Sequence, residues 1–184
     1  MKRAIDLAKT AIGRTSPNPM VGCVVVKDGN VISEACHERY GEFHAERNAL
    51  TRCKEDTRGA ELYVTLEPCC HYGKTPPCTE IIIEKGISKV YIGSLDSNPL
   101  VAGQGVEILK NAGIEVETGI LEKECIEMNE VFFHFIKEKK KIFSKAEKGF
   151  KLHTSKNKHS ETMFSFADTS RFISTLLLAP CGVI

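Results

Sequence analysis

The order of apolar and polar positions along the chain predicts one helix, a hairpin, and then strands and helices in alternation. Apolar residues recur at helical spacing over residues 2–12, and a buried strand over 21–26 is followed by the turn sequence Lys27-Asp28-Gly29-Asn30. Further along, the pattern predicts helices at 44–50, 78–85 and 105–111, and strands at 31–33, 60–66, 89–93 and 115–118. This alternation favours an α/β fold of three layers, with a mixed central sheet of about five strands flanked by helices.

The pattern changes near residue 140. Residues 121–139 predict one long amphipathic helix, with an apolar side made of Ile126, Val131, Phe132 and Phe135. Beyond it, periodicity is poor, and the last 44 residues hold seven of the 25 basic but only three of the 24 acidic side chains. We therefore expect one folded domain at 1–140 and a divergent basic tail at 141–184.

Composition and charge narrow the function classes only slightly. The chain of 184 residues has 42% hydrophobic and 27% charged residues and a net charge of +1. A balance so close to neutral gives no electrostatic case for binding nucleic acid or a membrane. No apolar run reaches the roughly 18–20 residues that a membrane-spanning helix needs, and the first residues lack the apolar stretch of a secretory signal. We therefore expect a cytoplasmic protein.

Three metal-binding side chains occur in an order typical of catalytic zinc. His44 and Glu46 stand two positions apart at the start of a predicted helix, Cys69 follows a predicted strand, and Cys78 opens the next helix. One imidazole and two thiolates leave the fourth tetrahedral position of a zinc ion (Zn²⁺) open for water. Glu46 is placed to move protons between this water and a substrate. The pattern predicts hydrolysis of an amino group to ammonia and a carbonyl.

Other interpretations of these residues stay open at this stage. Cys70 directly follows Cys69, and only one of the two is expected to face the metal because neighbouring side chains diverge at the end of a strand. A structural zinc site would need a fourth protein ligand, which Cys70 or His71 could supply. Such a site would have no use for the carboxylate of Glu46.

Several longer stretches resemble the deaminase domain of the riboflavin-biosynthesis deaminase-reductase, a member of the cytidine-deaminase-like superfamily. The stretches, which together span about residues 1–140, are Thr15–Gly22, His37–Gly41, His44–Glu46, the run TLEPCCHYGKTPPC from Thr65 to Cys78, and Asp96–Gly105. The resemblance selects Cys69 over Cys70 as the metal ligand. Eight residues separate Cys69 from Cys78, whereas cytidine, deoxycytidylate and tRNA-adenosine deaminases usually have two residues between their paired cysteines.

The resemblance implies a specific reaction and a set of substrate-binding residues. The substrate would be 2,5-diamino-6-ribosylamino-4(3H)-pyrimidinone 5′-phosphate, and the product 5-amino-6-(5-phosphoribosylamino)uracil. Matching motif positions imply that the substrate is contacted by Asn18, His37, His71, Lys74, Asp96 and Asn98. The chemistry of these side chains agrees with this, since a phosphorylated ribose needs cationic or N–H donors and a polar pyrimidine needs amide and carboxyl partners.

The sequence also departs from that family. No apolar strand and Ser/Thr-Leu-Asp-Gly stretch of a reductase domain follows residue 140, so we expect no reductase activity. At Ser33–Cys36 the family more often has glycines. The alternatives are a deaminase of another base, such as cytidine, guanine or a tRNA anticodon, and a non-catalytic zinc-binding remnant. A homo-oligomer is possible.

Overall fold

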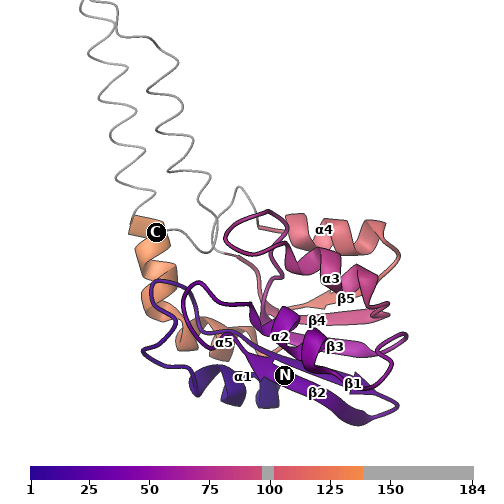
Figure 1. The fold of residues 1–184 in the computed structure, drawn as a ribbon. Helices are drawn as coiled ribbons and strands as arrows, with labels where there is room; N and C mark the ends of the chain where they lie inside the picture. The colour runs from indigo at the N-terminus through magenta and orange to yellow at the C-terminus, as the bar shows by residue number, and fades with distance from the viewer. Residues whose placement is uncertain (97–101, 139–184) are drawn as a thin grey trace, which may run out of the picture.

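The core of the molecule is a mixed sheet of five strands in the order β2-β1-β3-β4-β5 (Figure 1). The computed structural model describes residues 1–96 and 102–138. Strand β1 (Gly22–Lys27) pairs antiparallel with β2 (Asn30–Cys36) and with β3 (Glu61–Leu66). Strand β4 (Lys89–Ser94) pairs parallel with β3 and with β5 (Glu115–Thr118). The predicted α/β class and the predicted number of strands are confirmed.

Helices cover both faces of this sheet and complete the three predicted layers. One layer contains α2 (Ala45–Arg52), α3 (Cys78–Glu84) and α4 (Gln104–Asn111). The other contains α1 (Lys2–Lys9) and α5 (Glu122–Met128), which contact each other as well as the sheet. Within the described residues, no helix is both long enough and apolar enough to span a membrane.

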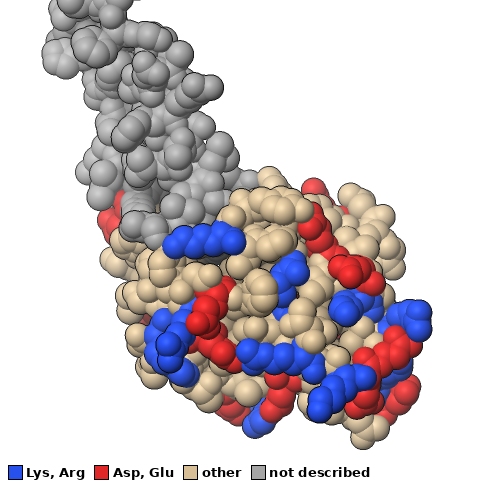
Figure 2. Space-filling model, in the orientation of Figure 1, with Lys and Arg blue, Asp and Glu red and all other residues tan. Residues whose placement is uncertain are grey.

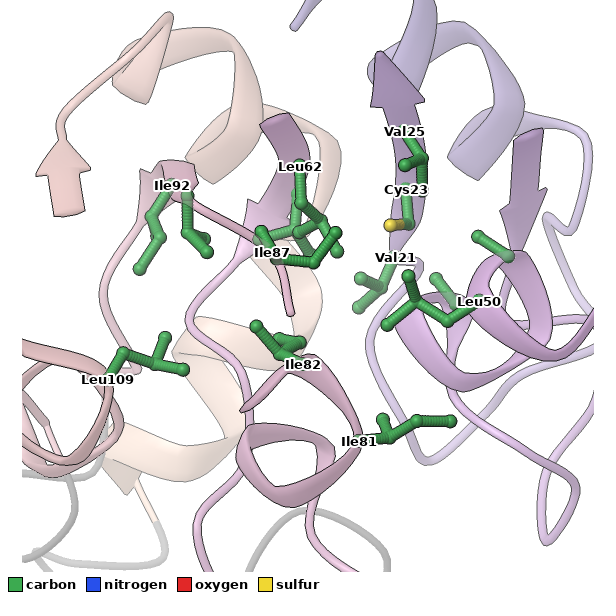
Figure 3. Close-up of a cluster of buried hydrophobic side chains, with 14 of the residues drawn as sticks. Val21, Cys23, Val25, Leu50, Leu62, Ile81, Ile82, Ile87, Ile92 and Leu109 are labelled. Carbon is green, nitrogen blue, oxygen red and sulfur yellow. The ribbon is translucent and has the colours of Figure 1, made fainter. Parts of the chain in front are cut away.

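The main hydrophobic core lies between the sheet and the layer of α2, α3 and α4. Because successive strand residues point to opposite faces, every second residue of β1, β3 and β4 enters this core. Figure 3 shows Cys23 and Val25 from β1 on the same side as Leu50 of α2 and Ile82 of α3. These side chains are almost completely buried, so the loops at the ends of the strands start from a rigid platform.

Small residues let the second helical layer approach the opposite face. A Cβ atom added to Gly22 of β1 would lie 1.9 Å from the Ala4 carbonyl oxygen of α1. One added to Gly93 of β4 would lie 2.4 Å from the Cys125 sulfur of α5. Both glycines face away from the main core, toward α1 and α5. Because any side chain would collide there, only glycine lets these helices approach the sheet so closely.

The prediction of one long helix at 121–139 is wrong in two respects. The helix is interrupted at Asn129, and a second helical stretch runs from 130 to 138. The side that faces the sheet contains Cys125, Asn129 and Phe133. Three of the four residues of the predicted apolar side are exposed instead, Ile126 by 41%, Val131 by 84% and Phe135 by 40%, whereas Phe132 is half-buried. The close approach of Cys125 to Gly93 sets the orientation of α5, and residues spaced by four follow it inward.

Positive and negative side chains alternate over the visible surface. On the face in Figure 2, Lys and Arg lie interspersed with Asp and Glu. This mixture agrees with the near-neutral sequence. The basic tail predicted at 141–184 lies outside the described residues and stays a prediction.

Gly22→Ala should lower the free energy of unfolding by at least about 2 kcal/mol, because α1 must move to admit the methyl group. Urea denaturation followed by circular dichroism measures this. Gly73→Ala is the control, since a Cβ there meets no atom within 4 Å, and it should change the unfolding free energy by less than about 0.5 kcal/mol. Equal losses in both variants would contradict the packing described.

Candidate active site

Strand ends converge at one edge of the sheet. Because β1 is antiparallel to both of its neighbours, the start of β1 lies beside the end of β2 on one side and beside the end of β3 on the other. Because β4 runs parallel to β3, it ends at the same edge. His37, Cys69 and Asp96 follow the ends of β2, β3 and β4 by one to three residues. The crevice beyond the carboxyl ends of strands is the usual binding site in α/β folds.

The three predicted metal ligands come together at this edge. His44 is the N-cap of α2, and Cys78 is the first residue of α3. The His44 Nδ1 atom lies 3.4 Å from the Cys69 sulfur and 3.5 Å from the Cys78 sulfur. All three ligand atoms lie within 4.8 Å of one another, and the group contains no fourth His, Cys, Asp or Glu among the described residues.

The local electrostatics favour negative charge on the Cys69 sulfur. The backbone N–H of Cys78 at the start of α3 donates to the Cys69 sulfur at 3.3 Å. Hydrogen bonds from the Cys78 side chain and from His44 hold the pKa of Cys69 well below its usual range. One imidazole and two cysteine sulfurs are a donor set that suits zinc, so His44, Cys69 and Cys78 could hold this metal.

Glu46 lies beside this cluster and is only 3% exposed. Burial raises the pKa of its carboxyl to about 7, although the neighbouring His44 acts to lower it. Its Oε2 atom is buried and has no hydrogen-bond partner among the described residues. An unsatisfied carboxylate oxygen is costly to bury, and here it borders a pocket. The arrangement can exchange a proton with a ligand or a water molecule.

The pocket is an open depression of about 420 Å³, part of which is bulk solvent, and it is lined by the predicted substrate residues Asn18, His37 and Asp96, together with His44, Glu46 and Cys69. Burial lowers the pKa of His37, which favours the neutral ring. His37 Nδ1 donates to the Phe43 carbonyl at 3.1 Å, so Nε2 accepts from the Asn18 amide nitrogen at 3.2 Å. Because the amide nitrogen of Asn18 is used in this bond, its amide oxygen can accept a hydrogen bond from a ligand.

A second pocket of about 310 Å³ adjoins the first and shares Asn18, His44 and Cys69 with it. It is also lined by the predicted residues His71 and Lys74. The Lys74 ammonium donates to the Tyr40 hydroxyl at 2.8 Å and lies 4.0 Å from the centre of its ring. The Nδ1 atom of His71 is buried and has no hydrogen-bond partner in the described part of the chain. Asn98 lies outside the described residues.

The structure separates Cys70 from Cys69. The Cys70 sulfur lies 3.8 Å from the Gln104 side-chain oxygen at the start of α4, outside the group of ligand atoms. This geometry agrees with Cys69 as the ligand.

Sequence reasoning missed Glu67, which lines the first pocket and is 7% exposed. Its two carboxylate oxygens accept from the backbone N–H groups of Asp96 (3.2 Å), Gly103 (3.0 Å), Gly105 (3.0 Å) and Val106 (3.4 Å). Glu67 therefore ties the end of β3 to the segment after β4 and to the start of α4. Its position in the run TLEPCC, next to the predicted ligand Cys69, marks it as a candidate for the site, but the sequence does not reveal which groups it binds.

Comparison with known proteins agrees with this geometry. The model of the cytidine and deoxycytidylate deaminase zinc-binding region matches residues 1–94, which is about half of the chain. The chain belongs to this deaminase family. His44, Glu46, Cys69 and Cys78 all fall within the matched region.

Individual relatives narrow the likeness within the deaminases. The riboflavin biosynthesis protein RibD of Actinobacillus pleuropneumoniae is 58% identical over 140 residues, which cover 76% of this chain and 37% of that protein. The diaminohydroxyphosphoribosylamino-pyrimidine deaminase of Buchnera aphidicola subsp. Schizaphis graminum is 50% identical over 133 residues, which cover 72% of this chain and 90% of that protein. The structure of RibD from Acinetobacter baumannii is 52% identical with a TM-score of 0.71, over 72% of this chain and 38% of that one.

Glu67→Gln should lower the free energy of unfolding of this protein by about 1–3 kcal/mol, because the amide nitrogen cannot accept and leaves buried N–H groups unpaired. Glu107→Gln, at an exposed position on α4, is the matched control and should change it by less than about 0.5 kcal/mol. Chemical denaturation of both variants gives the comparison. A Glu67→Gln variant as stable as the control would remove Glu67 from its bridging role.

Proposed function

We propose that this chain catalyses the zinc-dependent hydrolytic deamination of 2,5-diamino-6-ribosylamino-4(3H)-pyrimidinone 5′-phosphate in riboflavin biosynthesis. The product would be 5-amino-6-(5-phosphoribosylamino)uracil, with release of ammonia. The observation that carries the proposal is the buried carboxylate of Glu46 beside the His44, Cys69 and Cys78 cluster, whose Oε2 atom has no hydrogen-bond partner among the described residues. The name of the Buchnera relative, 90% of whose length the chain covers, supports the choice of substrate.

Zinc held by His44, Cys69 and Cys78 would supply the activation of water near neutral pH. Glu46 then performs the proton transfers. It takes one proton from the attacking water and passes it to the ring nitrogen next to the carbon under attack. It then takes the second proton from the hydroxyl now on that carbon and delivers it to the departing amino group, which leaves as ammonia while the carbonyl forms. A carboxyl whose pKa lies near 7 can give and take a proton with little cost in either direction.

The two adjoining pockets match the two halves of a pyrimidine nucleotide. Asn18 and Asp96 line the pocket that contains Glu46, and they present amide and carboxyl groups to the base. His37 orients Asn18 through the hydrogen bond between their side chains. His71 and Lys74 line the second pocket, where cationic and N–H donors suit the ribose phosphate. Asn98 belongs to this proposal by its place in the sequence motif.

The purified protein should contain about one zinc ion per chain, and Cys69→Ser should lose most of it because a hydroxyl is a much poorer zinc ligand than a thiolate. Cys70→Ser is the matched control, one residue away in sequence, and should keep the metal. Metal analysis by plasma emission spectrometry distinguishes the two. Loss of zinc in the Cys70 variant alone would reassign the ligand.

Glu46→Gln should reduce ammonia release from the diaminopyrimidine nucleotide by at least about 1,000-fold, while zinc stays bound, because proton transfer fails and the ligands are intact. A coupled glutamate dehydrogenase assay measures the ammonia.

The same assay with cytidine, deoxycytidylate and guanine tests the alternative substrates. Faster ammonia release from one of these than from the diaminopyrimidine nucleotide would overturn the substrate assignment. A zinc-loaded wild-type protein that releases ammonia from none of them would support the non-catalytic alternative.

A further inference from the structure

Within the loop between α1 and β1, the segment from Pro17 to Met20 carries Asn18 into the pocket but has few backbone N–H groups that can hold it in place. The segment Pro17-Asn18-Pro19-Met20 contains two prolines, which lack an N–H group, so only Asn18 and Met20 can donate. The Asn18 N–H bonds to the Thr15 carbonyl at 2.8 Å, within the loop itself. The Met20 N–H is therefore the backbone donor that can attach this segment to the body of the domain, and the Met20 C=O is one of its acceptors.

Asn129 binds both of these groups. The Met20 N–H donates to the Asn129 side-chain oxygen at 2.8 Å, and the Asn129 amide nitrogen donates to the Met20 carbonyl at 2.8 Å. The planar amide thus pairs with the backbone as a neighbouring strand would. Asn129 is 6% exposed and stands at the break between α5 and the next helical stretch, 109 residues from Met20 in sequence.

The attachment continues directly to the pocket. Val21 follows Met20, and its carbonyl accepts the backbone N–H of His37 at 2.9 Å. Two residues before Met20, the Asn18 side chain bonds to the His37 ring at 3.2 Å. Met20 therefore lies between the two contacts that align Asn18 with His37, and a shift of its backbone moves Asn18 relative to the pocket.

We infer that Asn129 is a positioning residue for deamination, which holds the Met20 backbone so that Asn18 faces the bound pyrimidine. This inference rests on the proposed function. It also assigns a role in the site to a residue beyond 1–94, the segment that matches the deaminase family. A side chain that orients a binding group acts on affinity more than on the chemical step.

Asn129→Ala should raise KM for the diaminopyrimidine nucleotide roughly tenfold and change kcat by less than about twofold, with zinc content unchanged. Asn129→Ser, which can bond to one of the two Met20 groups but not to both, should give an intermediate KM and serves if the alanine variant folds poorly. Glu127→Ala is the matched control on α5, since this exposed side chain makes only a 3.8 Å ion pair with Lys123 among its described contacts.

A double-mutant cycle with Asn18→Ala decides whether Asn129 acts through Asn18. If it does, the double variant should have nearly the same KM as Asn18→Ala alone. If the two increases in KM multiply, or if Asn129→Ala lowers kcat and leaves KM unchanged, the inference is overturned. Wild-type protein that releases no ammonia from this nucleotide would instead refute the proposed function, so the two failures are distinguishable.

Discussion

Two cysteine sulfurs and one imidazole nitrogen occupy a small volume at the edge of the sheet, and this crowding constrains everything around it. Hydrogen bonding from Cys78 lowers the pKa of Cys69, while the same contact and burial raise the pKa of Cys78. Two thiolates at this separation repel each other unless a cation lies between them, and binding a divalent metal releases the remaining proton. The convergence of β3 with the starts of α2 and α3 is therefore suited to a metal centre.

Polar side chains around this centre divide into two groups. Asn18, His71 and Asp96 line the pockets, where they can meet a ligand. The side chains of Glu67, which also lines the first pocket, and Asn129 bind backbone groups instead: those of Glu67 at the start of α4 and those of Asn129 in the loop before β1. Buried carboxylate and amide groups must be hydrogen-bonded, and the loops they bind have no strand partner. The hydrogen bonds thus satisfy both the buried side chains and the backbone groups that they bind, and they hold the walls of the pocket in place.

The deaminase architecture extends further along the chain than the segment that matches the family. The match covers residues 1–94, which include the metal ligands and Glu46. The contacts of Gly103 and Val106 with Glu67, and of Asn129 with Met20, come from later residues. The chain spans about 37% of the length of its Actinobacillus and Bacillus relatives, whereas it covers about nine-tenths of the Buchnera deaminases. The described domain thus corresponds to the whole of one kind of relative and to part of the other.

The sequence by itself determined the order of helices and strands, because the spacing of apolar residues is a local property that each element carries. It also pointed to His44, Cys69 and Cys78 as candidate ligands, although only the family resemblance favoured Cys69 over Cys70. The inward side of α5 depended on tertiary structure. Its sequence has apolar residues on more than one side, and packing of Cys125 against Gly93 selected between them. The roles of Glu67 and Asn129 could not be predicted from the sequence either. Their backbone partners lie 29 to 109 residues away along the chain and come close only when the sheet has formed.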